Sequence, residues 1–135
     1  MATAFSLSNF LAADRLPRAR VVAKGLPNKA LRDLLADPAI TITDLSRVIA
    51  PRRTLDRRLK ERQSLTREES DRLAQFVLIL DLAGQVFGER AIAMEWLRTP
   101  KKFLDNDNPL DLMNSATGAA VIEERLLQAK HSFFA

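Results

Sequence analysis

Apolar residues recur three and four positions apart along most of this chain, and that spacing is typical of amphipathic α-helices. Between Asn28 and Ala36 the apolar positions are Ala30, Leu31, Leu34 and Leu35. Similar spacing continues over residues 44–49, 52–61, 66–87, 89–97 and 115–130. The pattern therefore predicts an all-α fold made of short helices and one long helix.

Capping residues and prolines predict where the helices of the first half begin and end. Residues 1–13 are expected to form a mobile or loosely docked tail, followed by a short helix from Arg18 to Lys24. Asn28 and Thr43 are expected as N-caps of the next two helices. Thr66 and Glu69 have the spacing of a capping box at the start of the long helix.

The second half is expected to contain three helices separated by a proline break and a polar turn. The helix over 89–97 places Ile92 and Trp96 four residues apart, and a single Trp at helical spacing is predicted to pack in the core. Asn108 is expected to cap a short helix that begins with Pro109, and Ser115 to cap the last helix, to about Lys130.

Composition limits the classes of protein to consider. The 135 residues are enough for one ordinary domain or two small ones, and 47% of them are hydrophobic. There is no Cys, and the apolar runs are too short to cross a bilayer. The first twenty residues lack the basic segment of a signal peptide. We therefore expect a cytoplasmic protein without a membrane partner.

Charge is distributed unevenly between the two halves. Residues 1–62 contain 13 Lys and Arg against 6 Asp and Glu, a net charge of +7, whereas residues 63–135 have a net charge of −3. Seven of the basic residues lie within residues 47–62. Two short helices, of which the second is strongly basic, are typical of a helix-turn-helix that binds DNA. The turn Ile49-Ala50-Pro51 lacks the small residue expected there.

Catalysis is not predicted. The chain has one His, no Cys and no glycine-rich phosphate loop, so Cys–His nucleophiles and multi-His metal sites are excluded. Asp105, Asp107 and Asp111 lie in turn and capping positions that need no catalytic explanation. We expect neither a metal nor a cofactor.

Two segments carry a resemblance to a known family. EWLRTP at 95–100, NPLDLM at 108–113 and TGAAVIEERLLQAKHSFFA at 117–135 resemble the toxin-binding domain of Xre/MbcA/ParS-type antitoxins. RRTLDRRLKERQSLTREESDRLAQ at 52–75 is similar to the Xre-like helix-turn-helix of the same proteins. The resemblance divides the chain into an N-terminal tail and short helix (1–25), an Xre-like helix-turn-helix domain (26–87) and a small helical toxin-binding or dimerisation domain (88–135).

The resemblance implies a type II antitoxin whose partner is a RES-domain toxin, an enzyme that consumes NAD⁺. It also implies a homodimer that represses its own operon by binding operator DNA. The alternative is a stand-alone helix-turn-helix regulator or a partition-type DNA-binding protein, in which the second half only dimerises. A more remote alternative is a repressor that senses a small molecule near Trp96.

Site residues follow from the same resemblance. The DNA-binding residues are expected in the recognition helix and are Arg52, Arg53, Thr54, Arg57, Arg58 and Lys60. The toxin-binding residues are expected on a basic edge and at the C-terminus, and are Arg98, Lys101, Lys102, Phe133, Phe134 and Ala135.

Overall fold

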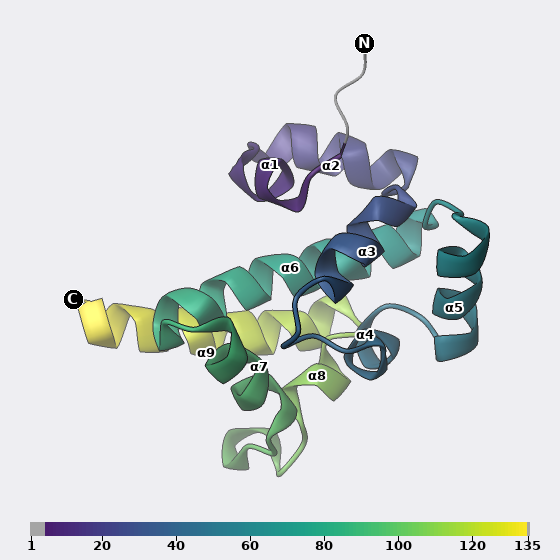
Figure 1. Cartoon of the computed structure of the whole chain (residues 1–135). Helices are drawn as coiled ribbons and strands as arrows, with labels where there is room; N and C mark the ends of the chain where they lie inside the picture. The colour runs from purple at the N-terminus through teal and green to yellow at the C-terminus, as the bar shows by residue number, and fades with distance from the viewer. Residues whose placement is uncertain (1–4, 135) are drawn as a thin grey trace. The chain divides into compact units, whose positions relative to one another are not determined.

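The computed structural model describes residues 5–134 and the side chains of residues 5–132. In this part of the chain the regular elements are helices, and the only β pairing described is an isolated bridge between Lys101 and Asp107. The elements, in order (Figure 1), are α1 (Leu7–Ala12), α2 (Arg15–Lys24), α3 (Asn28–Leu35), α4 (Ile42–Val48), α5 (Arg52–Glu61), α6 (Arg67–Phe87), α7 (Arg90–Arg98), the 3-10 helix η1 (Lys102–Leu104), α8 (Pro109–Leu112) and α9 (Ala116–Phe134). The all-α prediction is confirmed.

The chain forms two compact units, one up to Ala74 and one from Gln75 onward. The division lies within α6, and each unit is described separately below. Among the described residues, none of the helices is both long enough and apolar enough to span a membrane.

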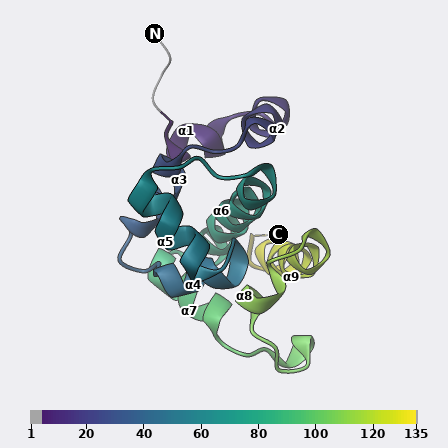
Figure 2. The same cartoon turned by 90° about the vertical axis from the view of Figure 1, so that its right-hand side faces the viewer.

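In the first unit α5 packs against both α3 and α4 (Figure 2). Each of these helices contributes a stripe of buried aliphatic residues, so that a shared core forms between them. The fully buried side chains of this core include Leu26, Leu31, Leu34, Leu45, Leu55 and Leu73.

The expected tail before Asp14 contains a helix instead. The Ser6 hydroxyl caps α1 by accepting a hydrogen bond from the Asn9 amide at 3.3 Å. Phe10 is only 5% exposed, and its ring centroid lies 6.1 Å from that of Phe5. One buried aromatic residue thus anchors a helix too short to show a clear apolar period.

Two predicted N-caps are wrong by one or two residues. Pro27 is the N-cap of α3, and Asn28 is the first residue of that helix. The buried Asn28 side chain makes hydrogen bonds outside α3. Thr41, not Thr43, caps α4, and it forms a capping box with Asp44. The capping box predicted for Thr66 and Glu69 is confirmed by both of its hydrogen bonds, at 2.9 and 3.1 Å.

In the second unit α8 packs against both α7 and α9. Its core is apolar, with contributions from each of its α-helices: Phe76, Leu80, Met94, Leu97, Leu110, Ile122 and Leu126. The predicted caps Asn108 and Ser115 are confirmed, and the Ser115 hydroxyl accepts a hydrogen bond from the Gly118 amide at 3.1 Å. Helix α9 continues four residues past the predicted end at Lys130.

The prediction that Trp96 packs in the core is wrong. Helix α7 buries Ala93, Met94 and Leu97, whereas Ile92 is 48% exposed and Trp96 is half-buried. The buried stripe of α7 is therefore rotated away from the Ile92–Trp96 pair, which lies toward the surface.

Candidate functional site

The basic helix α5 follows α4 after a tight turn. Helix α4 ends at Val48, and Ile49, Ala50 and Pro51 connect it to Arg52. Ile49 has φ −96° and Pro51 has φ −54°, and Ala50 is not among the residues with positive φ. The turn therefore needs no glycine, and the departure noted in the sequence leaves the helix-turn-helix geometry intact.

Helix α5 has one buried face and one basic exposed face. Leu55 is completely buried. Four basic side chains of α5 are exposed: Arg52, Arg53, Arg57 and Lys60. Arg53, Arg57 and Lys60 fall within one sector opposite Leu55, whereas Arg52 is the first residue of the helix, one turn before Leu55. In Figure 2 this helix faces the viewer. An α-helix fits the major groove of DNA, and Arg and Lys contact its phosphates and guanine edges.

Local partners restrain this basic face only weakly. The Arg52 guanidinium lies 3.9 Å from the Asp56 carboxylate, and the two side chains are 60% and 61% exposed. It also approaches the Thr43 hydroxyl at 3.5 Å. Exposed ion pairs of this kind contribute little to stability, so Arg52 can exchange them for a phosphate. Thr54, another expected DNA contact, is half-buried.

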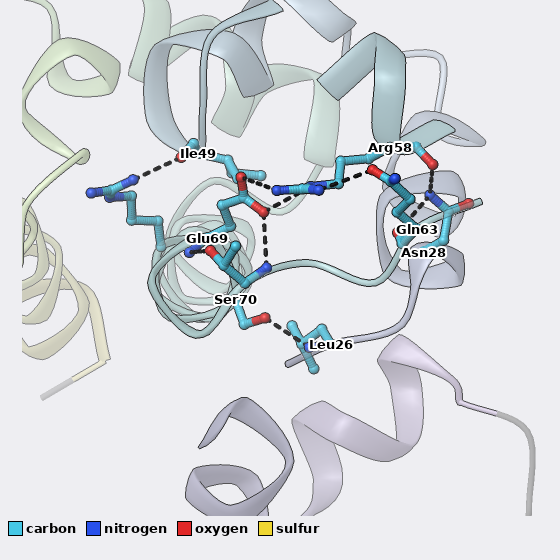
Figure 3. Close-up of polar contacts among 9 residues, drawn as sticks. Leu26, Asn28, Ile49, Arg58, Gln63, Glu69 and Ser70 are labelled. Atoms are coloured by element: carbon cyan, nitrogen blue, oxygen red, sulfur yellow. Dashed lines mark hydrogen bonds and ion pairs between the residues drawn. The ribbon is translucent and has the colours of Figure 1, made fainter. Parts of the chain in front are cut away.

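Arg58 has different surroundings from the other basic residues of α5. Its guanidinium donates hydrogen bonds to both carboxylate oxygens of Glu69, at 3.1 and 3.2 Å, and to the Gln63 side chain at 3.0 Å (Figure 3). The Arg58 and Glu69 side chains are only 14% and 9% exposed. This ion pair fastens the recognition helix to the start of α6, which is a positioning role.

The charge of Glu69 is stabilised by its partners. Burial by itself raises the pKa of this carboxyl group, but the Arg58 guanidinium and the hydrogen bonds from Thr66 outweigh it and lower the pKa below its ordinary value of 4.5. Glu69 therefore stays ionised and keeps the bidentate pair with Arg58.

Further hydrogen bonds hold α5 and its flanking loops in place (Figure 3). The Asn28 side-chain amide donates to the Arg58 carbonyl at 2.6 Å and to the Gln63 carbonyl at 3.3 Å. At the other end of α5, Arg72 donates to the Ile49 carbonyl at 3.1 Å. Both ends of the recognition helix are thus tied to neighbouring elements of the same unit.

The cations of the expected basic edge differ in exposure. Arg98 and Lys101 are half-buried, and Lys102 is exposed. Burial lowers the pKa of the Lys101 ammonium, and the nearby Glu95 carboxylate opposes this shift. Ala135 and the side chains of Phe133 and Phe134 lie outside the described residues.

An aromatic cluster on the second unit was missed by sequence reasoning. We call Phe87, Ile92, Trp96, Lys101 and Phe103 the Trp96 cluster. The Trp96 ring lies 5.6 Å from the Phe87 ring and 6.3 Å from the Phe103 ring, measured between centroids. All of these residues except Phe103 line an open depression of about 520 Å³ together with Ala91, Glu95 and Thr99.

Two cations lie over the rings of this cluster. Lys101 Nζ is 4.8 Å from the centroid of Trp96, and the Arg125 guanidinium carbon is 4.4 Å from that of Phe103. The signal in the sequence was the spacing of Ile92 and Trp96, from which helical periodicity assigned Trp96 to the core. Their exposure depends on the rotation of α7 and was not encoded in that spacing.

Two family models match the chain in the order of its two units. The antitoxin Xre-like helix-turn-helix domain matches residues 17–78. The antitoxin Xre/MbcA/ParS C-terminal toxin-binding domain matches residues 82–131. The first match contains α5, and the second contains the Trp96 cluster.

The chain is also similar to curated proteins. It is 38% identical over 85 residues to Antitoxin Xre of Pseudomonas putida, covering 63% of this chain and 54% of that protein. It is 35% identical over 85 residues to Antitoxin Xre of Yersinia enterocolitica, covering 62% and 57%. The matches thus span a little over half the length of these relatives.

A shorter segment of the chain is similar to a protein that is named as an enzyme. The chain is 44% identical over 57 residues to 6-hydroxy-3-succinoylpyridine 3-monooxygenase HspA of Pseudomonas putida, which covers 42% of this chain but only 17% of that protein. So small a part of an enzyme transfers no activity.

Proposed function

Because the chain belongs to the Xre/MbcA/ParS-type antitoxin family, we propose that it is the antitoxin of a type II toxin–antitoxin system. It binds and neutralises a cognate toxin through its second unit, and it binds DNA through the helix-turn-helix of its first unit. The antitoxin itself is not an enzyme.

The observation that carries the DNA-binding part is the exposed basic face of α5. Arg52, Arg53, Arg57 and Lys60 project from a helix whose ends are fixed by the Arg58–Glu69 pair and by Arg72. A rigid helix with cations on one face gives defined contacts with a groove, whereas mobile cations would give only diffuse attraction. We propose that the DNA is the chain's own operator and that binding represses the operon.

Arg58 is left out of the proposed DNA contacts. Its guanidinium already makes three hydrogen bonds, and withdrawing it would leave Glu69 buried without its cation. The proposed contacts are Arg52, Arg53, Arg57 and Lys60, with Thr54 near the start of the helix.

The toxin part of the proposal rests on the match to the toxin-binding domain over residues 82–131. We propose a RES-domain toxin that consumes NAD⁺, a homodimeric antitoxin and a cytoplasmic location. The C-terminal residues Phe133, Phe134 and Ala135 are proposed to enter the toxin's active-site cleft, together with contacts from Arg98, Lys101 and Lys102. Family membership supports these finer statements.

A DNA titration tests the proposed interface. Replacing Arg53 and Arg57 together with Ala removes two exposed charges from α5, so affinity for DNA upstream of the chain's own reading frame falls. The plot of log K against log salt becomes shallower by about one for each phosphate that is no longer neutralised. Fluorescence anisotropy at several salt concentrations measures both quantities.

The matched control for this titration is Arg20→Ala, an exposed cation on α2 of the same unit. It changes the net charge but leaves α5 intact, so it affects binding far less than the double variant. An unchanged affinity and slope in the Arg53→Ala/Arg57→Ala variant would contradict the assignment of this face.

A further inference from the structure

The Trp96 cluster is a partly exposed aromatic surface in a unit that has an apolar core of its own. Ile92 is 48% exposed and Phe103 is 37% exposed, and Trp96 between them is half-buried. Contiguous apolar surface of this kind marks binding sites on otherwise polar proteins, and Trp is the residue type most enriched at the energetic centres of interfaces.

The loop that carries Lys101 and Phe103 is held rigidly. The Lys101 amide donates to the Asp107 carbonyl at 3.1 Å, and the Lys101 carbonyl accepts from Leu104 and Asn106 at 3.0 and 2.9 Å. Asp105 and Asn106 have φ values of 53° and 70°, a left-handed conformation that Asp and Asn tolerate better than most residues. A surface fixed in this way loses little conformational entropy when a partner binds.

The charge around the cluster indicates what its occupant is. Lys101 and Arg125 lie over the rings, against the single carboxylate of Glu95 in the depression. Farther along the loop one exposed cation, Lys102, is accompanied by two exposed carboxylates, Asp105 and Asp107. Among the described residues, Lys101 and Arg125 form no short ion pair. Their charge is therefore available to carboxylates on a partner.

A nucleic acid is disfavoured as the occupant, although aromatic rings beside cations can stack bases. From residue 75 to residue 135 the chain has six Lys and Arg against eight Asp and Glu. The net negative charge of this part repels a polyanion, whereas a protein segment with a few carboxylates next to an apolar side chain matches the local charge.

We propose that the Trp96 cluster is the docking site for an acidic segment of the toxin, with an apolar side chain of that segment in the depression beside Trp96. This inference rests on the proposed function and identifies the surface that performs it. It assigns toxin affinity to a rigid surface on α7 and the following loop, in addition to the C-terminus.

Calorimetric titration of the full-length chain with an inactive variant of the toxin from the neighbouring reading frame tests this assignment. Trp96→Ala weakens binding by roughly 30-fold or more, the loss typical of a hot-spot residue. Lys101→Glu weakens it by about tenfold because it opposes the acidic segment. Trp96→Phe retains an aromatic ring and most of the affinity.

Two control variants separate a local effect from a general one. Leu78→Ala removes a side chain that is 38% exposed on α6, outside the cluster, and Lys24→Glu reverses an exposed charge in the first unit. Both bind the toxin with unchanged affinity. Circular dichroism and thermal unfolding show whether Trp96→Ala is folded. Lys101→Glu is a second, independent variant, because it alters a side chain outside the core.

The possible outcomes distinguish the two proposals. If the unmodified chain does not bind the toxin, the proposed function fails and this inference fails with it. If the unmodified chain binds and folded Trp96→Ala and Lys101→Glu bind equally well, only the inference fails. A change in oligomeric state with unaltered toxin affinity would assign the cluster to a second copy of the chain and would also overturn the inference.

Discussion

The Arg58 guanidinium donates two hydrogen bonds to the Glu69 carboxylate, and both side chains are largely buried. Replacing a whole buried ion pair with apolar residues is often nearly neutral, but removing one member leaves the other charge buried without a partner. The pair therefore acts chiefly as a constraint. It requires α5 and the start of α6 to keep one relative position.

Glu69→Gln removes the carboxylate charge with little change in volume. At neutral pH it lowers the free energy of unfolding by about 3 kcal/mol, because Arg58 loses its counter-ion. The folded-state pKa of Glu69 lies below 4.5, so the stabilisation that its charge provides is complete above pH 4.5. It is lost as the pH falls through the lowered pKa.

Urea unfolding of both proteins at neutral pH and at acid pH measures this effect. The difference in stability between the unmodified chain and Glu69→Gln is large at neutral pH and shrinks in acid, where the native carboxyl group is protonated. The exposed neighbour Glu68 supplies the control, since Glu68→Gln changes stability little at either pH. A difference that does not vary with pH would show that the ion pair is not the source.

Single positions were predictable from the sequence only where local spacing decides them. Arg58 was expected among the DNA contacts, although it lies three residues after Leu55 and this spacing places it near the buried side of α5. The sequence could not reveal that Glu69, eleven positions away, would neutralise it, because that contact depends on how α5 and α6 pack. The prediction that Trp96 packs in the core was wrong for a related reason, since the rotation of α7 about its axis depends on its packing against α8.

Among the elements, helix identity was predicted better than helix ends. Thr41 precedes α4 and Thr43 is its second residue, and Thr41 is the cap because Asp44 stands three residues later and completes the capping box. Helix α1 was missed because one buried residue, Phe10, holds it. The turn before α5 forms without a glycine because its residues keep negative φ values.

Helix α9 approaches the backbone of α8 closely at Gly118. A Cβ atom at this position would overlap the Leu112 carbonyl oxygen, which belongs to the backbone and cannot move without shifting α8. Gly118→Ala therefore lowers the free energy of unfolding by about 2 kcal/mol, in the range of overpacked core positions. Thermal or urea unfolding followed by circular dichroism measures the loss.

The chain provides its own control for this substitution. Gly84 also lies within a helix, and a Cβ atom there would meet nothing within 4 Å. Gly84→Ala keeps or raises stability by up to about 1 kcal/mol, since Ala favours the helix more than Gly. Equal effects of the two substitutions would show that the close approach of α9 to α8 has no energetic role.

At the scale of the whole molecule, the two activities are assigned to different units. The exposed basic face of α5 lies in the first unit, and the Trp96 cluster lies in the second. The uneven charge of the two halves is visible in the sequence and favours the proposed division of partners. The identity of the toxin and its NAD⁺ chemistry could not be predicted from spacing or charge, and the proposal takes them from family membership.

Cellular NAD⁺ is the measurement that tests the central claim most directly. Cells that express only the toxin encoded by the neighbouring reading frame lose NAD⁺, whereas cells that also express the full chain keep it. The Arg53→Ala/Arg57→Ala variant, expressed from an unrelated promoter, protects NAD⁺ equally well because α5 serves DNA binding. A chain cut after Lys130 protects poorly, because it lacks the residues proposed to enter the toxin's cleft.

The account predicts that NAD⁺ with the full chain stays at the level of cells without toxin. A fall to the level of cells expressing toxin alone would contradict the antitoxin assignment and would favour a stand-alone DNA-binding regulator.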